Sequence, residues 1–354
     1  MHGGQWQVYY LVLRQAQAGL FTPVVACPAG SALEAKLNEA GIKTIALSGS
    51  KQWNPVNLIK ILRAHLKRKF ALVHTHDGRA ASLGAFLHAL NLRRPKLLHT
   101  RRVAFPLRKR ALGKYKRADL VVAVSKHTAS ILEGCGLPPE KIQVIHSGID
   151  LNRYEQKALR ADNRFAFVAV GALTAQKGHA LIINAMARLT EIIAQSPCSN
   201  WPEWEVRIIG EGPTFNELLD LATKLEVADK LALLGAQDAS KILPFCDCML
   251  VPSLLSEGSN ATIKEAWAVG LPLICSDLAA NLELAEPEKS SLFFAAGKAS
   301  ELAENMARLM QNNALQEHLV AEGKLAVQRV TADRMAAAYT DIYKQVLNLP
   351  DDKI

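Results

Sequence analysis

Two glutamates lie close together in the second half of the chain, in a segment whose pattern predicts a strand, a loop and then a helix. Glu257 falls in the loop and Glu265 in the first turns of the helix, with Ser259 or Asn260 as the expected N-cap. Both carboxylates then lie near the end of one strand, where they can accept hydrogen bonds from the hydroxyl groups of a sugar or a ribose. The structural alternative is that Glu265 complements the helix dipole and Glu257 is merely solvated.

A lysine stands in a similar position after an earlier predicted strand. The loop begins at Gly171, contains Lys177 and opens a helix at about Gly178, so helix amides and an ammonium group can converge on a phosphate there. Glycines after strands also occur as plain turns, and this alternative stays open. The tight turn that contains Gly210 and Gly212 has the same two interpretations, turn chemistry or contact with a nucleotide.

The first half of the chain offers a different set of groups. Gly3 and Gly4 stand just before a helical pattern, where backbone amides can meet an anionic group unless the terminus is disordered. Several side chains that can carry a charge or transfer a proton fall near strand ends, although a histidine in a strand is more often structural. These candidates are His74, His76, His99 and Arg102.

The elements that must position these residues alternate along the chain. Short β-branched runs are followed by longer helical patterns, which predicts parallel strands with helices on both faces of each sheet. A polar stretch at residues 152–163 separates two such series. We therefore expect an α/β protein with two doubly wound, Rossmann-like domains facing each other across a cleft. The expected parts are residues 1–157, residues 158–330 and a final helix within residues 331–354, which can pack back on the first domain.

The pattern also predicts individual strands and helices. The candidate site residues fall just beyond the carboxyl ends of these strands, where open parallel sheets bind ligands. The first series has strands at residues 23–27, 43–47, 71–76, 96–100, 120–125 and 142–146. The second has strands at residues 165–170, 206–209, 231–234, 248–252, 271–276 and 291–294. Helices are expected at residues 32–40, 55–69, 78–90, 178–194 and 213–226.

Composition limits the class of protein. The 354 residues are 49% hydrophobic and 21% charged, which is ordinary for a globular chain and excludes wholly disordered, collagen-like and coiled-coil proteins. No apolar run approaches the roughly 20 residues that a membrane-spanning helix needs. Six sparse cysteines form neither a disulfide framework nor a metal-ligand spacing, so we expect a cytoplasmic protein that binds no metal.

Charge is distributed unevenly along the chain. The net charge is +9, and residues 51–117 hold 18 lysines and arginines but one acid, Asp77. Such a field attracts an anionic partner, which can be nucleic acid, an anionic lipid surface or a phosphorylated substrate. We expect no nucleic acid, because single-strand binders interleave aromatic residues with the charge and residues 93–117 contain only Phe105 and Tyr115. The apolar and basic helix expected at residues 55–69 either lies on a membrane or covers a sheet.

Taken in order, these segments resemble retaining glycosyltransferases of the GT-B fold, specifically glycosyltransferase family 4 (glycosyl transferases group 1), over nearly the whole chain. The most specific part is residues 252–277, where two glutamates separated by seven residues stand within Pro-Ser, Glu-Gly, Glu-Ala and Gly-Leu-Pro. By this resemblance Glu257 contacts the donor sugar, Glu265 the ribose and Lys177 the diphosphate. The other donor-binding residues that it implies are Gly3, Gly4, Gly171, Gly210, Gly212, Gly258, Ser259 and Asn260.

Three features depart from the family pattern. Ala172 stands where the family usually has an arginine, which removes one of two expected cations at the diphosphate. The first strand of the family is missing before Gly3, and because that strand would be central in the sheet, we expect the true start to lie upstream. Where some members carry a histidine at the catalytic site, this chain offers Arg102, or His99 if the alignment slips.

The resemblance implies transfer of a sugar from a UDP-, GDP- or ADP-sugar, with retention at the anomeric carbon and without a metal; the chain has no Asp-x-Asp motif. The acceptor would be an anionic glycolipid or polysaccharide of the cell envelope, of the lipopolysaccharide type. The protein would bind it by peripheral contact with the inner face of the plasma membrane. A donor phosphate oxygen would take the acceptor proton. The catalytic residues that we expect are Glu257, Lys177, Arg102 and His76.

Two alternatives of other kinds remain. The first is a catalytically impaired sugar-nucleotide-binding or scaffold protein of the same fold, because Ala172 and the missing strand both weaken the active site. Another GT-B enzyme, such as an epimerase or a phosphorylase, is the other. Turnover separates an enzyme from a scaffold.

Overall fold

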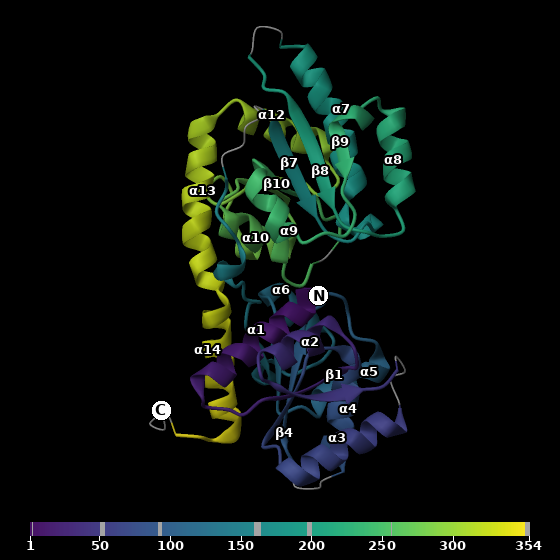
Figure 1. The fold of residues 1–354 in the computed structure, drawn as a ribbon, viewed down its shortest axis with the longest axis vertical. Helices are drawn as coiled ribbons and strands as arrows, with labels where there is room; N and C mark the ends of the chain where they lie inside the picture. Colours follow the sequence, from purple (N-terminus) through teal and green to yellow (C-terminus); the bar gives the residue numbers. More distant parts are fainter. Residues whose placement is uncertain are drawn as a thin grey trace. The chain divides into compact units, whose positions relative to one another are not determined.

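The chain folds into two compact units in a computed structural model, which describes residues 1, 3–49, 54–90, 94–158, 164–196, 200–255 and 257–350. Unit 1 comprises Met1–Gly148 and Val330–Ile354, and unit 2 comprises Ile149–Arg329. Each unit is an α/β assembly of parallel strands and helices (Figure 1). Within the described residues, no helix is both long and apolar enough to cross a bilayer.

The division between the units falls earlier than the expected boundary at residue 157. The described part of the polar stretch that we expected to be a linker is fastened to unit 2 by backbone hydrogen bonds, from the Lys157 N–H to the Val269 carbonyl (2.9 Å) and from the Ala158 N–H to the Pro244 carbonyl (2.8 Å). The Lys157 ammonium also pairs with Asp247 at 2.8 Å. A polar composition therefore marked a segment that packs as part of unit 2.

Unit 2 holds a parallel sheet of six described strands in the order β12-β11-β10-β7-β8-β9. This is a doubly wound order, because the fourth strand along the chain pairs with the first and the order reverses between them. The strands are apolar since helices cover both faces of a parallel sheet. They are β7 (Phe165–Val170), β8 (Trp204–Ile209), β9 (Leu231–Leu233), β10 (Cys248–Val251), β11 (Leu273–Ser276) and β12 (Leu292–Phe294).

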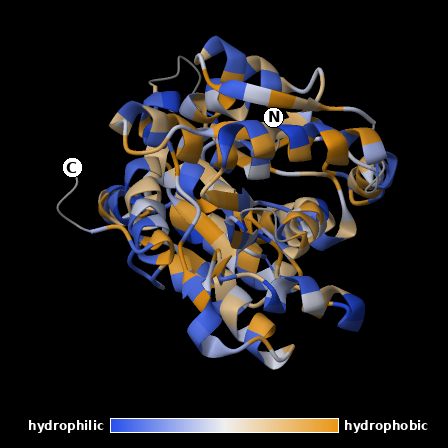
Figure 2. Ribbon diagram, turned by 90° about the horizontal axis from the view of Figure 1, so that it is seen from below, coloured by the Kyte–Doolittle hydropathy of each residue, from blue (hydrophilic) through white to orange (hydrophobic). Residues whose placement is uncertain are grey.

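Helices α7, α8 and α12 contribute buried apolar residues to the core around this sheet, α12 and α7 pack on each other, and α13 packs on α10. In Figure 2, hydrophobic and hydrophilic stretches alternate along the helices of the chain, as expected of helices with one buried face. The helices are α7 (His179–Ala194), α8 (Phe215–Lys224), α9 (Ala239–Ile242), α10 (Ala261–Val269), α11 (Ala279–Leu284), α12 (Ala299–Met310) and α13 (Asn313–Val327).

Unit 1 contains two separate parallel sheets among its described residues, β1-β2 and β3-β4-β5-β6. The expected upstream start of the chain stays a prediction. The strands are β1 (Val24–Pro28), β2 (Lys43–Leu47), β3 (Leu72–Thr75), β4 (Lys96–Arg101), β5 (Leu120–Ala123) and β6 (Ile142–Val144).

The last helix of the chain packs on the first helix of unit 1 (Figure 1). Tyr10 and Leu11 of one helix share a buried cluster with Met335 and Tyr339 of the other, together with Leu98 of β4. The helices of unit 1 are α1 (Gly3–Ala18), α2 (Ala32–Glu39), α3 (Pro55–Arg68), α4 (Gly78–Ala89), α5 (Lys109–Lys116), α6 (Lys126–Gly134) and α14 (Ala332–Leu347).

Trp267 anchors α10 against α13, and we predict that Trp267→Ala destabilises unit 2. Its side chain is 2% exposed, its indole N–H donates to the Ser290 carbonyl (3.1 Å), and it packs against Gly323. Removing a buried indole costs about 3–5 kcal/mol. Urea denaturation followed by circular dichroism measures this loss.

The control is Leu325→Ala on α13, whose side chain is 62% exposed. A surface change of this kind alters stability by less than about 0.5 kcal/mol. Equal losses in the two variants would contradict the assignment of Trp267 as the anchor.

Candidate active site

The loops after β7 and β10 meet in unit 2 because those two strands are neighbours. Phe167 pairs with Cys248 and Val168 with Met249 in a parallel register, so both strands end at the same edge of the sheet. At this point the strand order reverses, and doubly wound sheets bind ligands beyond the carboxyl ends of the strands at such a point. The first loop carries Lys177 and the second carries Glu257.

Backbone hydrogen bonds and glycines hold the loops in contact. The Leu254 N–H donates to the Gln176 carbonyl (2.9 Å), which joins the two loops directly. Gly178 has φ +70°, and a Cβ there would collide with the Pro252 carbonyl oxygen. Close packing of these loops therefore requires glycine at this position.

The turn after β8 joins the same assembly. A Cβ at Gly210 would collide with the Gly171 carbonyl oxygen, and one at Gly212 would collide with the Leu173 carbonyl oxygen. The Leu173 N–H donates to the Glu211 carbonyl at 2.9 Å. Gly171, Gly210 and Gly212 thus share one cluster of loops at the carboxyl edge of the sheet, and steric contact by itself accounts for the absence of side chains at Gly210 and Gly212.

Lys177 and Glu257 form an ion pair between the two loops. The Lys177 Nζ lies 2.7 Å from the Glu257 Oε1, and the Ser253 Oγ donates to the same oxygen at 2.8 Å. The Lys177 side chain is 30% exposed and that of Glu257 is 12% exposed. Two residues 80 positions apart in sequence thus form one partly buried, charge-assisted contact.

The residues between Glu257 and α10 form the turn that starts this helix, and Ser256 lies outside the described residues. Asn260 is the N-cap, although its side chain caps no backbone N–H and its Oδ1 instead accepts from the Thr262 hydroxyl (2.6 Å). Gly258 is buried, and the Ser259 Oγ accepts from the Lys264 ammonium at 2.7 Å. Lys264 is itself 1% exposed, so an ammonium is buried beneath this turn.

Glu265 lies on α10 with one carboxylate oxygen engaged and the other free to accept. The Tyr154 hydroxyl donates to the Glu265 Oε1 at 3.0 Å, whereas the buried Oε2 forms no hydrogen bond with the described residues. Burial raises the pKa of Glu265 above its usual value, and Tyr154 and Arg153 oppose this rise. A buried oxygen without a partner costs free energy unless a donor reaches it, and a ribose hydroxyl is such a donor.

His179, the first residue of α7, belongs to this site although the sequence analysis did not select it. It is 3% exposed, and its Nε2 lies 3.7 Å from where a Cβ on Gly171 would be. Burial, and after it the nearby Lys177 ammonium, lowers the pKa of His179 to about 4. The imidazole is therefore neutral at physiological pH. Its position directly after the Lys177-Gly178 pair was the signal that could have identified it.

A cluster of polar side chains connects β3, β4 and α14 in unit 1. The His74 Nδ1 lies 2.6 Å from the Tyr343 hydroxyl, and its Nε2 lies 2.7 Å from the Thr100 Oγ1. Thr100 in turn contacts the Tyr339 hydroxyl at 2.9 Å. Burial, followed by the charges of its neighbours, lowers the pKa of His74 well below its usual range. Both ring nitrogens of His74 are occupied, so it positions its neighbours and does not itself reach a substrate.

Arg102 and His76 lie at the edge of this cluster, beside the start of α1. The Arg102 guanidinium lies 3.2 Å from the His76 Nδ1, and the rings of His74 and His76 are 3.9 Å apart between centroids. A Cβ on Gly4 would lie 3.8 Å from the Arg102 side chain, whereas Gly3 begins α1 in open space. Burial and the adjacent Arg102 hold the pKa of His76 well below its usual range, so Arg102 carries the charge of this pair. His2 lies outside the described residues.

His99 lies on the other face of β4, away from Thr100. Its Nδ1 contacts the Thr75 hydroxyl and its Nε2 lies 3.2 Å from the Lys114 carbonyl. Burial lowers the pKa of His99 to about 4. Because side chains alternate between the faces of a strand, Arg102 and His99 cannot exchange roles, and the structure places Arg102 in the cluster.

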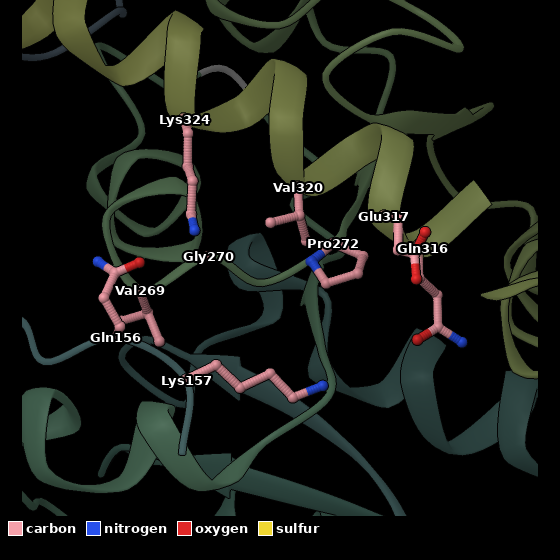
Figure 3. Close-up of a pocket in the computed structure, with 9 residues that line it drawn as sticks. All are labelled: Gln156, Lys157, Val269, Gly270, Pro272, Gln316, Glu317, Val320 and Lys324. Atoms are coloured by element: carbon pink, nitrogen blue, oxygen red, sulfur yellow. The ribbon is translucent and has the colours of Figure 1, made fainter. Parts of the chain in front are cut away.

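A separate hollow lies at the opposite edge of the sheet in unit 2, beside the amino end of β11 (Figure 3). Its volume is about 280 Å³, and α13 forms one wall. Within it Lys157 is already paired with Asp247. The hollow is therefore distinct from the Lys177–Glu257 site, which lies beyond the carboxyl ends of the strands. Its lining residues are Gln156, Lys157, Val269, Gly270, Pro272, Gln316, Glu317, Val320 and Lys324.

Comparison with known proteins identifies the family. The description "Glycosyltransferase Family 4" matches residues 1–153, and "Glycosyl transferases group 1" matches residues 151–326. The chain belongs to glycosyltransferase family 4. The family expected from residues 252–277 is thereby confirmed.

Solved structures support the fold of a family 4 protein. HepE of Anabaena, solved in complex with UDP and glucose, matches with a TM-score of 0.82 and 18% identity over 97% of this chain and 96% of that chain. The expected α/β fold of the GT-B class is confirmed by this similarity. UDP and glucose are the ligands of HepE in that structure. At 18% identity, the similarity supports only the fold of this chain.

Curated relatives of this family 4 chain are named as glycosyltransferases. The putative colanic acid biosynthesis glycosyltransferase WcaL of Salmonella typhimurium is 29% identical over 202 residues, covering 54% of this chain and 48% of the relative. The UDP-Gal:alpha-D-GlcNAc-diphosphoundecaprenol alpha-1,3-galactosyltransferase of Escherichia coli is 30% identical over 251 residues, covering 64% and 62%. The matched regions thus span about half to three-fifths of the lengths of these relatives.

We predict that the stability of unit 2 falls below pH 6.5 partly because of His179. Its folded pKa of about 4 lies below the ordinary value of about 6.5, so between these values the unfolded chain takes up a proton that the folded chain does not. Lower pH then favours unfolding, by up to about 1.4 kcal/mol per pH unit. The His179→Gln variant should lose less stability than the parent between pH 6.5 and 4.5 in urea titrations.

His318→Gln, on the exposed face of α13, serves as the matched control and should reproduce the steep pH dependence of the parent. If His179→Gln shows that same dependence, the assignment of a buried neutral imidazole is wrong.

Proposed function

We propose that this chain transfers a sugar from a nucleoside-diphosphate sugar to an anionic envelope glycolipid or polysaccharide precursor, with retention at the anomeric carbon. The observation that carries the proposal is the pairing of Lys177 with Glu257 across the loops after β7 and β10. A cation for a diphosphate and a carboxylate for sugar hydroxyls stand side by side there.

The donor binds in unit 2 with each end recognised by a different group. The diphosphate contacts Lys177 and the amides at the start of α7, where the helix dipole favours negative charge. The unpartnered Oε2 of Glu265 accepts from a ribose hydroxyl. Glu257 accepts from hydroxyls of the transferred sugar, and Gly258, Ser259 and Asn260 supply the surrounding backbone.

Catalysis in this proposal is mainly electrostatic. As the sugar leaves, negative charge develops on the diphosphate, and a fixed donor aimed at that charge contributes about 3–4 kcal/mol. Lys177 is the single cation of residues 171–178, because Ala172 contributes a methyl group. A donor phosphate oxygen takes the acceptor proton, so no protein base is required.

Unit 1 holds the acceptor in this proposal. Residues 51–117 attract an anionic partner, and Arg102 places one charge beside the start of α1 at Gly4. Burial lowers the pKa of His76, whose neutral ring beside Arg102 positions that guanidinium. A lipid-linked, phosphate-bearing saccharide fits this charge, and the name of the Escherichia coli galactosyltransferase describes such an acceptor. The uridine nucleotide in that name makes a UDP-sugar the first donor to test.

Helix α3 suits peripheral contact with an anionic membrane. Its inner face buries Ile61 and His65, while Val56, Ile59 and Leu66 are 52%, 47% and 50% exposed. Exposed basic residues end the helix. An apolar strip next to basic side chains binds the surface of an anionic bilayer.

We predict that a UDP-, GDP- or ADP-sugar raises the thermal stability of the parent protein, and that this shift disappears in Glu265→Ala. A ligand at 100 times its dissociation constant stabilises a protein by about 2.7 kcal/mol. Glu317→Ala, in an exposed position on α13 beside the separate hollow, is the control and should keep the shift. No shift with any of the nucleotide sugars would contradict a donor site in unit 2.

Turnover then separates an enzyme from a binding protein. With the donor that gives the largest shift and a polyprenyl-diphosphate-linked saccharide as acceptor, the enzyme forms a new glycosidic bond whose anomeric configuration, measured by nuclear magnetic resonance, equals that of the donor. Binding without turnover would favour the catalytically impaired protein that Ala172 suggests, and an inverted product would contradict retention.

We also predict that the protein binds vesicles containing phosphatidylglycerol more tightly than vesicles of phosphatidylcholine at low salt. Each basic residue near an anionic surface contributes about 1 kcal/mol, so Lys67→Glu with Arg68→Glu should weaken binding at least tenfold. Lys224→Glu with Lys241→Glu, exposed in unit 2, is the matched control. Equal binding of both vesicle types by the parent would contradict the proposal.

A further inference from the structure

In the proposed donor site, the positive charge of Lys177 and the negative charge of Glu257 neutralise each other in an ion pair. The pair is held in place by the Ser253 hydroxyl, which donates to the same carboxylate oxygen at 2.8 Å, and by the backbone hydrogen bond between Leu254 and Gln176. Since the Glu257 side chain is 12% exposed, water replaces a lost partner poorly. Breaking such a pair without a substitute leaves a costly, partly buried charge.

A diphosphate that binds Lys177 competes with Glu257 for the charge of this lysine. Lys177 is the single cation of residues 171–178, so no second lysine or arginine of this loop is available to the phosphates. His179 adds no charge there, because burial and Lys177 lower its pKa to about 4. The Lys264 ammonium is held by Ser259 beneath the next turn. The cation is therefore shared between the carboxylate of the protein and the phosphates of the ligand.

The outcome of this competition depends on whether the nucleotide carries a sugar. A bare nucleoside diphosphate that takes Lys177 leaves Glu257 with the Ser253 hydroxyl alone and places phosphate charge near a carboxylate. A nucleotide sugar takes the same lysine but offers hydroxyl donors to Glu257 in exchange, so neither charge loses its partner. The same ion pair thus weakens binding of the bare nucleotide more than binding of the donor.

We infer that the Lys177–Glu257 ion pair is a specificity device that makes the site prefer a sugar-loaded nucleotide over the bare nucleoside diphosphate. After transfer the sugar hydroxyls leave with the product, and Glu257 pairs with Lys177 again. The nucleotide product then no longer contacts this cation. Glu257 therefore acts both as a sugar ligand and as a competitor of the product. This inference rests on the proposed function, because it deepens the role of the same site.

The test measures the affinities of UDP and of a UDP-sugar for the parent protein and for Glu257→Gln by isothermal titration calorimetry. The UDP-sugar is whichever of UDP-glucose, UDP-galactose and UDP-N-acetylglucosamine gives the largest thermal shift. Gln is isosteric with Glu but cannot form the ion pair. We expect UDP to bind about 3- to 10-fold more tightly to the variant, since a charged hydrogen bond no longer has to be broken, and the UDP-sugar to bind more weakly.

Two further variants show whether the effect passes through Lys177. In a Lys177→Gln background, Glu257→Gln should tighten UDP binding much less than in the parent, because the competition for the ammonium is already gone. Glu288→Gln is the matched control. This glutamate pairs with Arg308 at 2.7 Å and lies just before the amino end of β12, away from the Lys177–Glu257 pair. Its replacement should change neither affinity. Circular dichroism and thermal unfolding establish that each variant is folded.

Opposite changes in the two affinities support the inference. If Glu257→Gln weakens UDP and the UDP-sugar alike, or leaves UDP unchanged, the ion pair does not discriminate between them and the inference is overturned. Equal tightening of UDP in the presence and absence of Lys177 also overturns it, because plain repulsion by the carboxylate would then explain the effect. A parent protein that binds no UDP-, GDP- or ADP-sugar overturns the proposed function itself, and with it this inference. If only a GDP- or ADP-sugar binds, the same comparison is made with that sugar and its bare nucleoside diphosphate.

Discussion

The pairing of β7 with β10 is the constraint on which the proposed donor site depends. These strands are not consecutive in the chain, yet their register ends both at one edge of the sheet, at the point where the strand order reverses. Lys177 and Glu257 come within 2.7 Å for that reason. The glycines around them follow from the same constraint, since Gly178 and Gly210 lie where a Cβ would collide with a carbonyl oxygen of the adjoining loop.

The two units have different electrostatic designs. In unit 2 the charges at the strand ends are paired or buried, as for Lys177 with Glu257 and Lys264 beneath Ser259. In unit 1 the cationic residues outnumber their acidic partners over residues 51–117. A site with balanced charges binds a diphosphate by exchange, whereas a field of one sign attracts anionic molecules over a distance. These properties match a small activated donor and a large anionic acceptor.

Much of the secondary structure was predictable because periodicity is local. The strand expected at residues 165–170 is β7 (Phe165–Val170), and the helix expected at residues 178–194 is α7 (His179–Ala194). The polar composition that suggested a linker at residues 152–163 does not reveal that, in the described part of this segment, the N–H of Lys157 donates to the carbonyl of Val269, over a hundred positions later in the chain. Candidate site residues were selected from the sequence where a motif carried them, as with Glu257, and were missed where burial alone draws attention to them, as with His179.

The amino-acid sequence by itself determined the α/β class, the order of the elements, the family and the identity of the charged groups, since these properties depend on residue type and short-range spacing. Only the tertiary structure decided which groups meet. It placed Arg102 and not His99 beside His76, left one oxygen of Glu265 without a hydrogen-bond partner among the described residues, and joined Lys177 to Glu257. The physical reason is that strand pairing and burial act between distant parts of the chain, and contact energies depend on distances that spacing in sequence does not encode.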